Sequence, residues 1–115
     1  MSFLALASQK SLLTLQKSFL QLQFIGIQND IQYAQAQMSA IQTEYNKNKD
    51  SSGSSSDYTE DSNYIYFEQL DEQLSTEKDS LDSQLTAIEN EIASLKTMVN
   101  NNIKTSCTLN LATGS

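Results

Sequence analysis

Few side chains in this 115-residue chain could take part in covalent chemistry. Its single cysteine, Cys107, is the strongest nucleophile, but a thiolate forms near neutral pH only beside a base or a cation. The sequence contains no histidine, which is the usual general base. Gly26, Gly53 and Gly114 stand too far apart to form a glycine-rich phosphate loop. We therefore expect no enzymatic activity, no catalytic residue and no cofactor.

Carboxylates are the remaining candidates for ligand chemistry, and four of them cluster near the middle of the chain: Asp50, Asp57, Glu60 and Asp61. A calcium-binding EF-hand loop needs oxygen ligands at every second position, a glycine at the sixth and a glutamate at the twelfth. These four residues do not have that spacing. With one cysteine and no histidine, zinc and other transition-metal sites are excluded as well, so we expect no metal site.

The charge balance limits the classes of partner. Fourteen acidic residues against seven lysines give a net charge of −7, which repels nucleic acid, so we expect no nucleic-acid partner. The most apolar window, residues 11–28, contains Lys17 and several glutamines and serines, which is too polar for a membrane span. Residues 1–10 lack the charged start of a cleaved signal peptide. We expect the protein to be cytoplasmic or to be exported without one.

The spacing of apolar residues predicts an all-α fold. In residues 3–47 the apolar positions advance, after an initial step of seven, by alternating steps of four and three, which is a heptad pattern typical of a helix that buries one seam. The same pattern returns in residues 63–104, where Asp71 and Lys78 interrupt it at seam positions, as Lys10 and Lys17 do near the amino end of the first segment. We call these positions the hairpin seam: Leu13, Leu20, Phe24, Ile27, Ile31, Ala34, Met38, Ile41 and Tyr45, then Tyr64, Phe67, Leu74, Leu81, Leu85, Ile88, Ile92, Leu95 and Val99.

Proline is absent and glycine rare, so both helices can be long. Residues 48–62 contain a serine-rich run typical of a flexible linker, and a linker of this length lets the chain reverse. We predict one domain, a long antiparallel helical hairpin in which the two seams bury each other, with a tail at 105–115. One extended helical chain that pairs with other copies is the alternative. Asp57 with Glu60, or Asn63, is the predicted cap of the second helix.

The first helix carries a second apolar row almost opposite the seam, at about 100° per residue. It comprises Leu12, Leu15, Phe19, Leu22, Gly26 and Tyr33. The side chains around this row are mostly glutamines, and the first 29 residues contain no acid. A hairpin partner on the seam side leaves this row in water, and a contiguous apolar patch is typical of an interface.

We therefore predict that the row mediates self-association. Two forms remain open: a small bundle closed by a second copy, and an assembly such as a filament, which grows because its contacts do not close. A different class of function is also open, in which the row holds one specific helical partner, as in a coiled-coil adaptor or a secretion chaperone.

In composition and architecture the chain resembles two groups of small helical proteins. It has one cysteine, no tryptophan and many glutamine, serine and asparagine residues, and in this it is similar to the needle, filament and flagellin-like subunits of type III secretion systems. In size it also resembles the secreted WXG-type hairpins, although residues 48–62 contain no Trp-X-Gly. No functional residue is carried over from either group.

Overall fold

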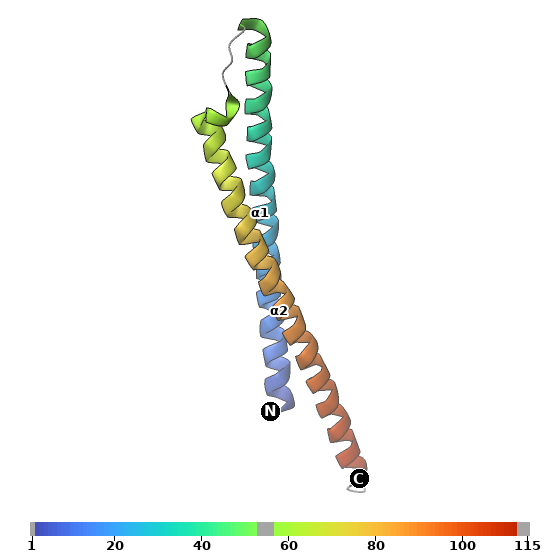
Figure 1. The fold of residues 1–115 in the computed structure, drawn as a ribbon. Helices are drawn as coiled ribbons and strands as arrows, with labels where there is room; N and C mark the ends of the chain where they lie inside the picture. The colour runs from blue at the N-terminus through green and yellow to red at the C-terminus, as the bar shows by residue number, and fades with distance from the viewer. Residues whose placement is uncertain (1, 53–56, 113–115) are drawn as a thin grey trace. The chain divides into compact units, whose positions relative to one another are not determined.

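The chain folds as an all-α helical hairpin, which confirms the predicted fold class. The computed structural model describes the backbone of residues 2–52 and 57–112 and the side chains of residues 2–48 and 57–105. Two long helices, α1 (Phe3–Ser52) and α2 (Ser62–Ala112), account for nearly all of this part of the chain, and a short 3₁₀ helix, η1 (Tyr58–Glu60), precedes α2 (Figure 1).

Both helices are longer than the sequence pattern predicts. α1 continues past residue 47 to Ser52, and α2 continues past residue 104 through most of the predicted tail. The physical reason is the absence of helix breakers: after Gly26 the next glycine is Gly53, and after that Gly114, with no proline anywhere. Residues 53–56 of the serine-rich run lie outside the described residues.

The ends of the helices are stabilised by side chains. Ser2 caps α1, because its hydroxyl oxygen accepts a hydrogen bond from the Ala5 backbone N–H at 3.2 Å. Asp61, and not Asp57 or Asn63, caps α2: its Oδ1 accepts from the backbone N–H groups of Asn63 (2.8 Å) and Tyr64 (3.1 Å). Asp57 instead caps η1 by accepting from the Thr59 backbone N–H at 3.0 Å. The prediction of the α2 cap was therefore wrong.

The chain divides into two compact units, each built from a segment of both helices. Unit 1 comprises Met1–Leu22 and Asp82–Ser115, and unit 2 comprises Gln23–Leu81. In unit 2, Gln35 of α1 contacts Asp71 of α2, and Tyr45, ten residues further along α1, contacts Asp61, ten residues earlier in the chain than Asp71. The two segments therefore run antiparallel. Whether the chain is one domain stays a prediction.

Candidate self-association surface

The hairpin seam residues occupy the protected face of both helices. Ala34, Tyr64, Leu74, Leu81 and Leu85 are buried, at 9% exposure or less. The other seam residues that the sequence predicts are partly buried: Leu13, Leu20, Phe24, Ile27, Ile31, Met38, Ile41, Tyr45, Phe67, Ile88, Ile92, Leu95 and Val99. A heptad seam shared by two antiparallel helices has this narrow, incompletely covered core, because only one neighbour covers each helix.

Polar residues at seam positions are accommodated by contacts across the hairpin. In unit 2 the ammonium of Lys78 lies 5.7 Å from the centre of the Phe24 ring, within the range of a cation–π contact. In unit 1 the Lys17 ammonium lies 3.7 Å from a Glu89 carboxylate oxygen. Both lysines are partly buried: their aliphatic chains pack against the hairpin, and their ammonium groups contact Phe24 and Glu89.

Several apolar side chains of α1 are exposed in unit 1, and four of them form a row. Leu12 is 57% exposed, Leu15 68%, Phe19 63% and Leu22 69%. They follow one another at steps of three, four and three residues, which places them along one face of the helix, almost opposite Leu13 and Leu20 of the seam. We call these four residues the apolar stripe. Single exposed leucines are common, but a contiguous row on one helix face is typical of an interaction surface.

The surroundings of the apolar stripe are neutral. Ser11, Gln16, Ser18 and Gln23 are exposed on either side of it, Ser8 is exposed in line with it one turn before Leu12, and no acidic residue occurs on α1 before Asp30. The only charged side chains of α1 in unit 1 are Lys10 and Lys17, and both are partly buried away from the stripe. Burying the stripe against another protein surface therefore requires no charge to lose its water, which removes the largest cost of forming an interface.

The structure places the last two residues of the predicted outward row in unit 2. Gly26 is exposed, and a Cβ built on it would meet no atom within 4 Å, so nothing in the hairpin requires a glycine there. Tyr33 is 59% exposed, yet its ring packs edge-to-face on Phe67 of α2, with centroids 6.1 Å apart. Tyr33 is therefore an exposed residue of the outward row whose ring also reaches the rim of the seam.

Further apolar residues of α1 are exposed that the sequence pattern did not single out: Phe3 at 48%, Leu4 at 74% and Ile25 at 52%. Leu4 precedes Leu15 by eleven residues, which is close to three full helical turns, so it lies on the same face as the apolar stripe. The eleven-residue spacing between Leu4 and Leu15 is the feature of the sequence from which the place of Leu4 could have been predicted. On α2 the exposed large apolar residues are Ile65, Tyr66, Met98 and Ile103.

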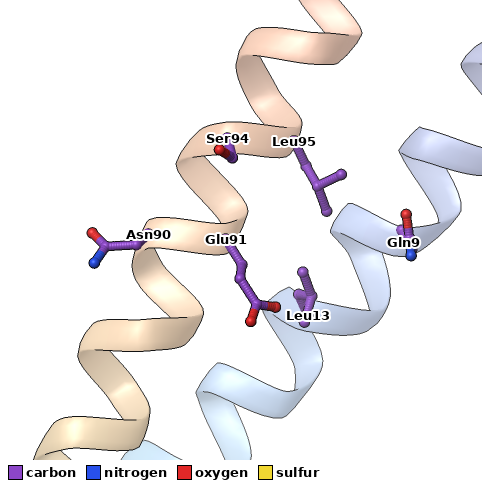
Figure 2. A pocket seen from close by; sticks show the side chains of 6 residues that line it. All are labelled: Gln9, Leu13, Asn90, Glu91, Ser94 and Leu95. Carbon is purple, nitrogen blue, oxygen red and sulfur yellow. The ribbon is translucent and has the colours of Figure 1, made fainter.

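A groove of about 380 Å³ lies between the helices of unit 1. Leu13 and Leu95 point toward each other across it and Glu91 reaches toward Leu13, whereas Asn90 points away (Figure 2). Gln9 and Ser94 complete its lining. A small-molecule site needs several polar groups that converge on the ligand. Glu91 is the only titratable side chain that lines this groove. We therefore interpret the groove as an incompletely filled part of the seam and not as a ligand site.

Asp61, one of the acidic residues near the loop, has a structural role. The Asp61 carboxylate accepts a hydrogen bond from the Tyr45 hydroxyl at 2.8 Å in addition to its two backbone bonds. The Tyr45 hydroxyl and the backbone N–H of Tyr64 stabilise the charged carboxylate and lower the pKa of Asp61. The same bond to Asp61 raises the pKa of Tyr45. Within the described residues no group of three or more acidic or cysteine side chains could hold a metal ion.

The aromatic residues beside these acids pack mainly on one another. Tyr58 and Tyr64 meet edge-to-face with centroids 5.1 Å apart, and Tyr66 and Phe67 do so at 5.2 Å. Tyr64 is buried and its hydroxyl oxygen accepts from the Gln42 amide at 3.4 Å. Core packing thus accounts for Tyr64 and Phe67, while Tyr66 remains 59% exposed.

The side chain of Cys107 lies outside the described residues. None of the helices, as far as the structure describes them, combines the length and apolarity needed to cross a membrane. No family model, no curated protein and no solved structure matches the chain.

Proposed function

We propose that the protein is a structural, self-assembling protein whose copies associate through the apolar stripe of α1. The observation that carries this proposal is the exposure of Leu12, Leu15, Phe19 and Leu22, at 57–69%, along one face of unit 1. The other face of the same helix already packs against α2, so the hairpin itself cannot cover the stripe. The protein acts by binding other protein, and we propose no enzymatic activity for it.

The size of the expected gain supports an interface. Full burial of a Leu or Phe side chain contributes about 1.5–3 kcal/mol, so burying one that is two-thirds exposed contributes about 1–2 kcal/mol. Two copies that meet stripe to stripe bury twice the four side chains, and the neutral flanks add no charge to desolvate. A second copy fits the stripe because each copy presents the same apolar row, which is what an isologous contact requires.

The test is the mass of the purified chain by light scattering over a wide concentration range, with negative-stain imaging of the same samples. A mass that rises above the 12.8 kDa of the single chain with concentration supports self-assembly. Fibres in the images identify a filament subunit, and a fixed dimer or tetramer identifies a closed bundle. A mass of 12.8 kDa at every concentration overturns the proposal and favours the adaptor class, in which the stripe holds a different helical protein.

A further inference from the structure

We infer that Lys78, through its contact with the Phe24 ring, selects the register in which α1 and α2 pair in unit 2. Register here means which residue of α1 lies level with which residue of α2. The pairing lies within one chain, so it goes beyond the proposed self-association and holds whether or not copies associate.

The apolar seam alone does not fix the register. In unit 2 the seam positions advance by alternating steps of three and four residues, from Phe24 to Tyr45 on α1 and from Tyr64 to Leu81 on α2. Both helices therefore repeat every seven residues without interruption. A slip of seven residues along α1 brings the seam positions of α2 level with seam positions again.

The connection between the helices does not fix the register either. Gln42 contacts Tyr64, so the end of α1 at Ser52 and the start of α2 at Ser62 lie about 12 Å apart along the helix axis. A slip of seven residues changes this separation by about 10 Å in either direction. The nine residues 53–61 span up to about 30 Å when extended, which is enough for either slip.

The glutamine contacts across the seam are compatible with several registers. The amide of Gln35 donates to Asp71 Oδ1 at 3.4 Å, and the amide of Gln42 donates to the Tyr64 hydroxyl oxygen at 3.4 Å. Gln28, Gln35 and Gln42 follow one another at seven-residue intervals. Asp71 therefore lies level with a glutamine in either neighbouring register as well, and these contacts do not choose among the registers.

Lys78 is the seam residue that distinguishes the registers. Its ammonium lies 5.7 Å from the centre of the Phe24 ring, within the range of a cation–π contact. The α1 positions seven residues before and after Phe24 are Lys17 and Ile31. A slip in one direction brings Lys78 level with the like charge of Lys17, and a slip in the other brings it level with Ile31, which offers the ammonium no partner. A lysine at a single seam position fixes register at a cost in stability.

The slip toward Ile31 gives the main competing register. In that register Tyr45, which in the structure donates to Asp61, lies level with Glu68 and keeps a carboxylate as its acceptor. The opposite slip brings Asp61 level with Met38, which has no hydrogen to donate. Without the lysine, the chain therefore loses its main discrimination against the slip toward Ile31.

Distances between spin labels within one chain measure the register. In a Cys107→Ser background, Ser39→Cys and Thr76→Cys place one label on each helix, at exposed positions outside the seam. The contacts on either side of Ser39 place it level with residue 67, so the labels are offset by nine residues, or about 14 Å, along the axis. The slip toward Ile31 reduces this offset to about 3 Å, and the opposite slip raises it to about 24 Å.

Dipolar spectroscopy of the labelled chain, diluted with an excess of unlabelled chain, compares Lys78→Leu with two controls. Lys78→Arg keeps a cation over the ring, and Lys47→Leu removes an exposed lysine of unit 2 outside the seam. We expect a single distance for the wild type and for both controls. Lys78→Leu should add a shorter distance, with the ratio of slipped to native register raised by about 2- to 30-fold. Its melting temperature should not fall, because leucine suits a seam position.

Phe24→Leu removes the same contact from the other helix and should add the same shorter distance. Circular dichroism checks that each variant keeps the helix content of the wild type. A single, wild-type distance in Lys78→Leu overturns the inference, and so does a second distance in the wild type or in Lys47→Leu. A second distance in Lys78→Leu but not in Phe24→Leu also overturns it, because the ring is then not what holds the register.

Discussion

Asp61 links the two helices of unit 2 at their loop end. Its carboxylate caps α2 and also accepts a hydrogen bond from the hydroxyl of Tyr45 on α1, so a single side chain fixes both the start of one helix and its contact with the other. Sequence alone could not identify this cap. Asp57, Asp61 and Asn63 are all chemically suitable, and the choice among them depends on Tyr45, which is distant in sequence and close only after folding.

The lowered pKa of Asp61 predicts a pH dependence of stability. Because the folded pKa lies below the ordinary value of 3.8, the stabilisation is fully present above pH 3.8 and is lost as the pH falls through the folded pKa. The raised pKa of Tyr45 sets the other limit: its contribution is complete below pH 10.0 and is lost as the pH rises through the folded pKa.

Asp61→Asn isolates this effect, because asparagine can still cap a helix but carries no charge. We expect the wild type to unfold at a higher urea concentration than the variant at pH 7, and this difference to shrink as the pH is lowered below 3.8. Urea titrations followed by circular dichroism measure both proteins at each pH. The two proteins differ only at position 61, so a difference that stays constant with pH would refute the assignment.

At the scale of the helices, periodicity made the seam predictable and the ends unpredictable. Seam residues such as Leu74 and Leu85 recur at heptad spacing and are buried. Helix ends depend on small local preferences, and the serine and asparagine residues after position 47 do not stop α1 without a glycine or proline. The contact of Tyr33 with Phe67 was not predicted, because it depends on a long ring that reaches the rim of the seam from an outward-facing position.

The division of α1 and α2 into a seam and a stripe predicts different costs for the same substitution. Leu85 is 9% exposed, so Leu85→Ala removes buried packing and should lower the free energy of unfolding by about 2–4 kcal/mol. Leu15 is 68% exposed, so in the monomer Leu15→Ala should change the free energy of unfolding by less than ~0.5 kcal/mol. Urea unfolding at a concentration where the chain is monomeric measures both. Equal losses would show that the stripe belongs to the core of the hairpin.

At the scale of the whole molecule, the charge of −7 predicts that salt stabilises the fold. Repulsion among the eleven acidic residues of unit 2 opposes folding, and added salt screens it. The ion pair between Lys17 and Glu89 is exposed on the glutamate side and contributes little to oppose this trend. We expect the melting temperature to rise when sodium chloride is increased from about 0.05 to about 0.5 M. A fall would mean that attractive ion pairs dominate.

The central claim is that the apolar stripe holds copies of the protein together, and paired substitutions test it. Leu15→Glu with Leu22→Glu places two charges in the stripe. Thr14→Glu with Gln21→Glu is the matched control, because these residues are exposed, have the same spacing and lie one position earlier, on a different face of α1. Both variants add two acids to the same helix, but only the first places them in the stripe and removes two of its leucines.

The deciding measurement is the mass of the two variants and the wild type by light scattering, with helix content by circular dichroism. We expect the Leu15→Glu, Leu22→Glu chain to remain at 12.8 kDa and to keep the helix content of the monomer, while the control variant associates as the wild type does. Association of the Leu15→Glu, Leu22→Glu chain at wild-type concentrations, or loss of its helix content at every concentration, would contradict the claim that the stripe is an interface separate from the fold.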